Sequence, residues 1–188
     1  GEEYPEFKKT SRIAAENFMV STLDKRASDA GAKMLKSGGH AIDATIAAQM
    51  VLNVVEPQSS GIGGGAFLLY HDKKNNKSIY YNGREIAPKK SHDKIFIKDD
   101  GSVMSFHEAV NGGLSVGTPG LLKILSQTHK KYGKLKWKAL FDPAIKLAKE
   151  GFPMDNKIRT ILKDVKYLKN NPELKKLYFN QDGTIKKN

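Results

Sequence analysis

Cysteine is absent from all 188 residues. Its absence excludes disulfide scaffolds, cysteine nucleophiles and thiolate metal sites, and it leaves the redox compartment open. The chain has five histidines, but no two of them have the spacing of a metal-ligand pair such as His-x-x-x-His. The sequence therefore predicts neither a bound metal nor any other cofactor. The histidines are His40, His71, His92, His107 and His129.

A long hydrophobic run is also lacking. A membrane-spanning helix needs about 18 or more consecutive apolar residues. The longest apolar stretch here is interrupted by Asp43, Thr45, Gln49 and Asn53. The first seven residues have neither the basic start nor the apolar middle of a signal peptide. We therefore expect no membrane span, and we expect that any export signal was removed or was never present.

Arginine is scarce, although the chain is strongly basic. The net charge is +12, yet only four of the 32 basic residues are arginine, and the lysines are spread over nearly every segment. Specific nucleic-acid sites depend on arginine for paired contacts to bases and on interleaved aromatic residues for stacking. Dispersed lysine indicates a solvated surface, so we expect no nucleic-acid partner. Each arginine becomes more informative because there are so few.

The spacing of the apolar residues predicts several helices. Apolar residues between 27 and 35 have helical spacing, and Gly38-Gly39 ends that helix. Residues 40–55 are apolar on nearly all sides, which is typical of a buried helix, with Asp43 in its first turn. A third helix is expected from Thr118, its N-cap, through Pro119 to about residue 131. A fourth is expected from Asp142, its cap, to Gly151. A fifth is expected over residues 155–169.

Two apolar runs separated by a polar turn predict a β-hairpin. The runs are residues 66–70 and 78–81, and residues 72–77 form the turn. Another short strand is expected at residues 95–97. Helices combined with an antiparallel hairpin indicate a mixed fold, α/β in the broad sense and α+β in the narrower one.

A glycine-rich string lies between the predicted helix 40–55 and the hairpin. Residues 61–66 match the Gly-x-Gly-x-x-Ala pattern of dinucleotide-binding proteins, but a helix precedes them and a strand follows. Pyrophosphate binding requires the reverse order. The string therefore indicates a tight connection whose missing side chains let other backbone or a ligand approach closely. Ser115 lies in a Gly-x-Ser-x-Gly match, but the Thr118-Pro119 helix start after it does not support a nucleophile elbow.

Five ordered blocks of the sequence resemble the gamma-glutamyltranspeptidase (gamma-glutamyltransferase) family. The blocks are residues 38–44, 54–57, 60–65, 83–88 and 114–120. Their order and spacing match the family, and the similarity runs from about residue 20 to the end of the chain. The block at 83–88 reads Gly-Arg-Glu-Ile-Ala-Pro. His40 departs from the family, which usually has Asn there. The change is expected either to alter only a local hydrogen bond or to mark a divergent branch of the family.

The resemblance implies part of an N-terminal nucleophile hydrolase, whose α-β-β-α sandwich comes from a self-cleaving precursor. Residues 1–188 would be the N-terminal portion of the large subunit, so the fold is expected to be incomplete here. The small subunit of the same precursor would be its partner and would carry the nucleophilic threonine. No catalytic residue is therefore expected in this chain. The family also implies a periplasmic or secreted location.

The resemblance also implies a role for Arg84 and Glu85 in substrate binding. In the family, the arginine of this block binds the α-carboxylate of the γ-glutamyl group. A planar guanidinium offers two parallel donors that fit a carboxylate, which a lysine cannot reproduce. Glu85 is expected to orient Arg84 or the neighbouring backbone. The alternative is that Arg84 is an ordinary surface ion-pair partner.

The function implied is transfer or hydrolysis of the γ-glutamyl group of glutathione or a related small γ-glutamyl amide. One alternative is a branch that acts on poly-γ-glutamate or on an acyl amide such as a cephalosporin side chain. Another is a fragment of the fold without catalysis. A threonine at a self-cleavage junction downstream would distinguish both enzymes from that fragment.

Overall fold

The computed structural model describes residues 14–110, 112–164 and 171–186. Its helices and strands follow one another along the chain as two helices, a hairpin and five further helices. They are α1 (Lys25–Lys36), α2 (Ala41–Val55), β1 (Ala66–Asp72), β2 (Lys77–Gly83), α3 (Phe106–Val110), α4 (Leu121–Tyr132), α5 (Asp142–Glu150), α6 (Asn156–Asp164) and α7 (Pro172–Tyr178). Two 3₁₀ helices, η1 (Gly113–Ser115) and η2 (Trp137–Phe141), precede α4 and α5.

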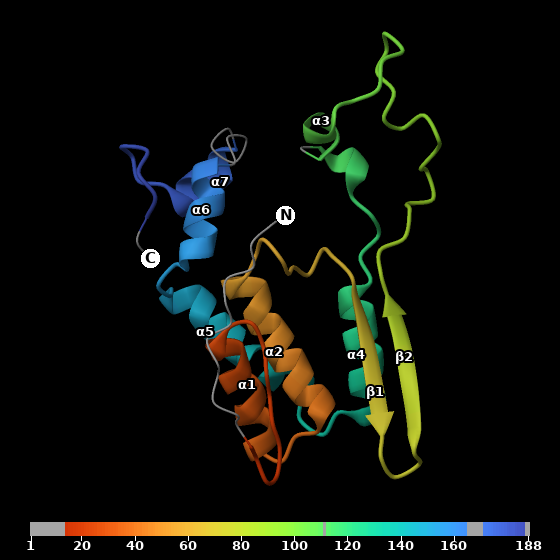
Figure 1. Ribbon diagram of the computed structural model, residues 1–188, viewed down its shortest axis with the longest axis vertical. Coiled ribbons are helices and arrows are strands. Elements are labelled where there is room, and N and C mark those ends of the chain that lie inside the picture. Colours follow the sequence, from red (N-terminus) through yellow and green to blue (C-terminus); the bar gives the residue numbers. More distant parts are fainter. Residues whose placement is uncertain (1–13, 111, 165–170, 187–188) are drawn as a thin grey trace.

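Helix α2 is the centre of the molecule. Helices α1, α4, α5 and η2 all pack against it, and α4 also packs against strand β2 (Figure 1). Ile46, Val51 and Val55 on α2 are fully buried, as expected for a helix that is apolar on nearly all sides. Among the described residues, no helix combines the length and the apolar character that crossing a membrane requires.

The predicted hairpin is confirmed, and its two faces differ. Ala66 pairs with Gly83, and the antiparallel register continues to Asp72 opposite Lys77. Leu68 is buried on the face that looks toward the core. The opposite face is apolar but bare: Phe67 is 60% exposed, Leu69 73% and Tyr80 57%. On this face the rings of Phe67 and Tyr80 contact each other across the strands in a tilted arrangement, with their centroids 5.6 Å apart.

A long arm, residues 84–120, leaves the end of β2 and returns to α4. A bridge closes its base: Thr118 N donates to Ile86 O at 2.8 Å, and Ile86 N donates to Thr118 O at 3.3 Å. The prediction that Thr118 caps α4 is therefore wrong, because this non-local pairing holds Thr118 in extended backbone. The helix begins after Gly120, which makes no side-chain cap.

Other element boundaries also differ from the predictions. Helix α1 begins earlier than expected, because the carboxylate of Asp24 accepts a hydrogen bond from Arg26 N and caps it. The strand expected at 95–97 is reduced to a single bridge between Ile97 and Val103. Asp142 lies within α5 and does not cap it, because η2 runs directly into that helix. The helix expected over 155–169 is observed as α6, and residues 165–170 lie outside the described residues.

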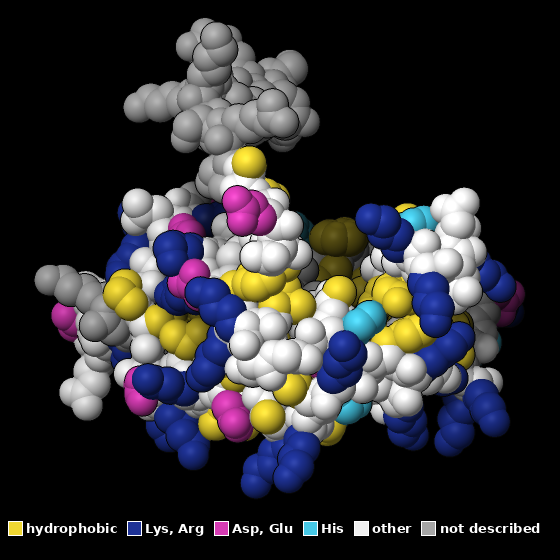
Figure 2. Space-filling model, turned by 90° about the horizontal axis from the view of Figure 1, so that it is seen from below, with side chains coloured by type: hydrophobic (Ala, Val, Ile, Leu, Met, Phe, Trp, Pro, Cys, Tyr) yellow, Lys and Arg dark blue, Asp and Glu magenta, His cyan; other side chains and the backbone are white. Residues whose placement is uncertain are grey.

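Lysine side chains are dispersed over the surface, as the sequence predicts. Figure 2 views the molecule from the end that carries the hairpin turn and shows them in separate places, interspersed with polar and acidic groups.

Asp43 anchors the start of α2. Its side chain is fully buried, and Oδ2 accepts hydrogen bonds from the backbone N–H groups of His40 at 2.7 Å, Lys134 at 2.9 Å and Leu135 at 3.4 Å. Nδ1 of His40 accepts from Ile42 N at 3.2 Å. His40 therefore caps the start of α2 through its side chain.

We expect Asp43→Ala to lower the free energy of unfolding of the full-length protein by about 3 kcal/mol, because three backbone donors lose their buried acceptor. Urea unfolding followed by circular dichroism measures this change. Thr45→Ala is the control on the same helix. Among the described residues its hydroxyl bonds only to Ala41 O, and Thr45 is exposed, so we expect a change within about 0.5 kcal/mol. Equal effects of the two substitutions would contradict the anchoring role of Asp43.

We expect residues 1–188, expressed alone, to self-associate through the bare apolar face of the hairpin. Replacing Leu69 with Lys should shift the population toward monomer in sedimentation velocity. Ser78→Lys is the control, because Ser78 is exposed on the same hairpin but is already polar. A monomeric chain that unfolds cooperatively would argue against this expectation.

Candidate functional site

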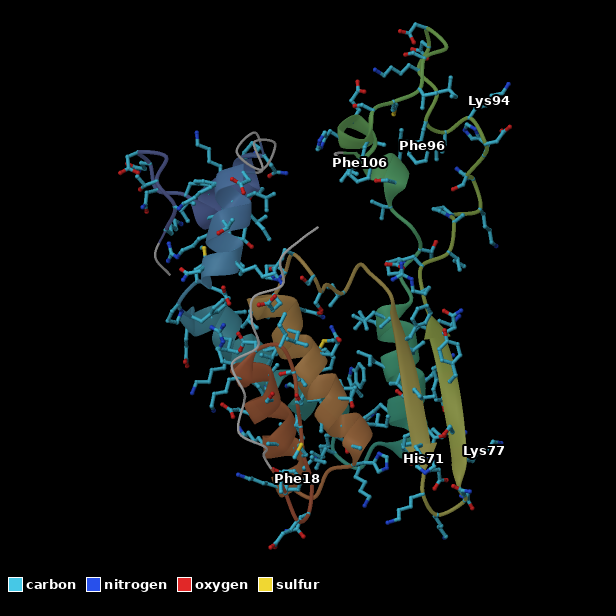
Figure 3. The ribbon with its side chains drawn as sticks, in the orientation of Figure 1. Phe18, His71, Lys77, Lys94, Phe96 and Phe106 are labelled. Carbon is cyan, nitrogen blue, oxygen red and sulfur yellow. The ribbon has the colours of Figure 1, made fainter. Side chains whose placement is uncertain are left out.

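The candidate site lies at the end of the hairpin opposite its turn. His71 and Lys77 mark the turn, whereas Phe96 and Phe106 belong to the arm beyond the other end (Figure 3). Arg84 follows the last residue of β2, so the strand delivers its side chain to the base of the arm. The backbone N–H of Arg84 donates to Asn82 Oδ1 at 3.0 Å, which fixes the turn out of the strand.

Arg84 and Glu85, the two residues predicted for substrate binding, lie together. Nη2 of Arg84 is 3.3 Å from Oε2 of Glu85. The guanidinium carbon also lies 5.9 Å from the ring centroid of Phe67 on β1. The Arg84 side chain is 56% exposed, so the guanidinium is held on one side and open on the other. An anion can therefore approach the donors that do not face Glu85.

The carboxylate of Glu85 is only partly satisfied. Its Oε2 is buried and accepts no hydrogen bond from the described residues, so the ion pair with Arg84 is its polar contact. A buried carboxylate oxygen without a hydrogen bond is costly and strongly favours a nearby cation. Glu85 therefore draws the guanidinium of Arg84 toward a fixed position.

Glycines allow the backbone to close around Glu85. A Cβ atom on Gly65 would lie 2.7 Å from Glu85 Oε2 and 2.6 Å from Gly83 O, and one on Gly117 would lie 2.8 Å from Glu85 Cβ. Gly64 O accepts from the backbone N–H groups at the start of α4, with Gly120 N at 3.2 Å. The glycine string thus makes the close connection that the sequence predicts, with a helix before it and a strand after it.

A pocket of about 430 Å³ adjoins Arg84 and Glu85. Its polar lining also includes Gln49 from α2 and Ser59 and Ser60 from the loop. Arg84 is the one cationic side chain among the described residues that line it. The arrangement is suited to holding the anionic end of a small molecule.

Gln49 and the two serines were not predicted as site residues. The signal available was that Gln49 and Asn53 are polar positions one turn apart in the apolar second half of the helix.

A larger cavity of about 580 Å³ lies elsewhere, bordered by α5, α6 and α7. Neither Arg84 nor Glu85 lines it, and its lining is mainly apolar. We therefore place the candidate site in the smaller pocket. Among the described residues, no three His, Asp or Glu side chains come together as they would to hold a metal ion.

A protein-family model matches most of the chain: the gamma-glutamyltranspeptidase model matches residues 27–188. A curated relative, "Glutathione hydrolase proenzyme" of Bacillus subtilis (strain 168), is 40% identical over 161 residues. That match covers 86% of this chain and 27% of the relative. The chain thus spans about a quarter of the length of this protein.

Solved structures agree with the sequence comparison. The gamma-glutamyltranspeptidase of Helicobacter pylori superposes with a TM-score of 0.82 at 31% identity, over 93% of this chain and 51% of that chain. A cephalosporin acylase from Bacillus halodurans superposes with a TM-score of 0.62 at 26% identity, over 95% of this chain and 33% of that chain.

We expect Gly65→Ala to lower the free energy of unfolding by about 1–3 kcal/mol, because the added methyl group overlaps the Gly83 carbonyl and the Glu85 carboxylate. Thermal or urea unfolding of the full-length protein measures the change. Gly61→Ala is the matched control in the same loop, since no atom lies within 4 Å of the added Cβ. The close approach is refuted if both variants are equally stable.

Proposed function

The chain belongs to the gamma-glutamyltranspeptidase family, and we propose that it is the N-terminal portion, residues 1–188, of the large subunit of an enzyme that transfers or hydrolyses a γ-glutamyl group. Its fold is the expected incomplete α+β part of an N-terminal nucleophile hydrolase. The observation that carries the proposed activity is the guanidinium of Arg84, paired with Glu85 beside a pocket with no second cation among its described lining residues.

Arg84 would bind the α-carboxylate of the γ-glutamyl group. One side of its guanidinium faces Glu85. Within the described part of the chain no hydrogen bond uses the remaining donors, so they could make the two parallel hydrogen bonds that a carboxylate accepts. Glu85 would act through Arg84, because its buried Oε2 limits where the guanidinium can lie. The substrate would thereby be held at its amino-acid end, and the γ-amide would be directed away from the clamp.

The chemical step would belong to another part of the same precursor. In the proposed enzyme, the small subunit supplies an N-terminal threonine whose hydroxyl attacks the γ-carbonyl and whose α-amino group takes the proton. The relative from Bacillus subtilis is called a proenzyme, which supports processing of a longer precursor. Residues 1–188 alone would then be inactive, and the mature enzyme would be periplasmic or secreted.

The acylase alternative is less well supported. The superposition with the cephalosporin acylase has the lower TM-score, 0.62 against 0.82, although it covers a similar share of this chain. The chemical argument rests on the proposed clamp, because Arg84 would favour donors that carry a carboxylate at the end remote from the amide, as γ-glutamyl donors do.

In the processed enzyme, we expect Arg84→Ala to reduce kcat/KM for γ-glutamyl-4-nitroanilide by roughly thirty-fold to several thousand-fold, as expected when one partner of a desolvated ion pair is lost. 4-Aminobutyryl-4-nitroanilide lacks only the α-carboxylate, so its slow turnover should change little. Arg84→Lys should recover part of the loss, because the charge returns without the paired geometry. Self-cleavage should persist in both variants.

Lys77→Ala is the matched control, because it removes an exposed cation from the other end of the same strand. If Arg84→Ala stays within about two-fold of wild type for the γ-glutamyl donor while the protein remains folded, Arg84 is not the clamp. Equal losses on both donors would show instead that the substitution damages the site in general.

A further inference from the structure

Three polar side chains form a closed hydrogen-bonded triangle between helix α2 and the glycine loop. Gln49 Nε2 donates to Asn53 Oδ1 at 2.9 Å and to Ser60 Oγ at 2.5 Å. The hydroxyl of Ser60 in turn donates to Asn53 Oδ1. Both protons of the Gln49 amide and the proton of Ser60 are therefore used within the triangle. Turning the Gln49 amide alone would place its oxygen against the Asn53 oxygen, so the orientations of the two amides depend on each other.

The triangle joins the loop to the helix just before the glycines. Ser59 N and Ser60 N both donate to Glu56 O, which closes the turn after α2. The next backbone hydrogen bond, from Gly64 N to Gly61 O, lies within the loop itself. Among the described residues, the hydroxyl of Ser60 is therefore the side-chain link that ties this part of the loop to α2.

The end of the loop at Gly64 and Gly65 forms the wall behind Glu85. The loop is held at two points, by the triangle at Ser60 and by the start of α4 at Gly64 O. Glu85 Oε1 lies 3.4 Å from the Cβ position of Gly64, and Oε2 lies 2.7 Å from that of Gly65. With so little space, a shift of the loop changes the room available to the carboxylate. Because Glu85 holds Arg84, such a shift also changes where the guanidinium lies.

We propose that Gln49, Asn53 and Ser60 are positioning residues that set the affinity of the Arg84 pocket for the anionic end of the substrate. They act through the glycine loop and Glu85, and they take no part in the chemical step. This inference rests on the proposed function, because the γ-glutamyl donor supplies the anion. A variant of Asn53 distinguishes a positioning role from direct contact with the substrate, because Asn53 belongs to the triangle but is not among the residues that line the pocket.

Steady-state kinetics of the processed full-length enzyme test the proposal. Asn53→Leu and Ser60→Ala should each raise KM for γ-glutamyl-4-nitroanilide by about three- to ten-fold, the loss expected for one or two hydrogen bonds, with kcat within about two-fold. The double variant should resemble either single variant, because one substitution already opens the triangle. Ser60→Thr, which keeps the hydroxyl, should restore most of the affinity.

Thr45→Ala is the control, since it lies one turn before Gln49 on α2 and bonds only within its own helix. If Ser60→Ala raises KM while Asn53→Leu does not, Ser60 contacts the substrate directly and the positioning role is wrong. An unchanged KM in both variants, or a fall in kcat alone, also overturns it. Equal effects on 4-aminobutyryl-4-nitroanilide would mean that the triangle does not act through the carboxylate clamp.

Calorimetric titration with L-glutamate separates this proposal from the proposed function. An enzyme that turns over no γ-glutamyl donor contradicts the function, yet weaker glutamate binding by Asn53→Leu would still support the positioning role. Glutamate binding that is equal in wild type and both variants overturns the positioning role. A wild-type protein that binds no glutamate contradicts both.

Discussion

The structure depends on one buried carboxylate, that of Asp43. A fully buried charge is costly unless hydrogen bonds replace the water it has lost. Asp43 Oδ2 gains these bonds from the backbone N–H groups of His40, Lys134 and Leu135, far apart in the sequence. The helices α1, α4, α5 and η2 all pack on α2. Holding the first turn of α2 in place therefore also sets the position of the surface on which they pack. The other oxygen of Asp43, Oδ1, accepts no hydrogen bond from the described residues, and His129 lies beside it with Nε2 3.6 Å from Oδ1 and 2.9 Å from Leu135 O.

The candidate site is built from the other end of the same helix. After α2, the chain turns through Glu56 and the glycine loop into β1, and the hairpin then brings Arg84 and Glu85 back beside that loop. Glycine at position 65 is a requirement of this close approach, because any side chain there would meet the Gly83 carbonyl and the Glu85 carboxylate. The missing side chain at Gly65 is therefore what allows the loop, the end of β2 and Glu85 to lie so close together.

The sequence predicts those features that depend on local pattern. The all-round apolar character of 40–55 identifies the buried helix, and the two apolar runs identify the hairpin. Arg84 and Glu85 were singled out by the resemblance to the family, and the scarcity of arginine only made each arginine more informative. Features set by distant contacts were not predicted. Thr118 has the residue type of a cap, but its pairing with Ile86 decides its conformation. The triangle of Gln49, Asn53 and Ser60 was missed for the same reason, since it requires a helix and a loop to meet in space.

The solvent exposure of Arg84 connects the proposed binding of a carboxylate with the bare apolar face of the hairpin. An ion pair as exposed as this one contributes about 0–1 kcal/mol, whereas a desolvated pair loses about 2–5 kcal/mol when one partner is removed. A strong clamp in the proposed enzyme therefore requires that water be excluded from the open side of the guanidinium. Phe67, on the bare face, lies beside that guanidinium, with 5.9 Å between the guanidinium carbon and the ring centroid. A partner surface that covers Phe67 and Leu69 would also lower the solvent exposure of Arg84, so the same burial that completes the fold would strengthen the clamp.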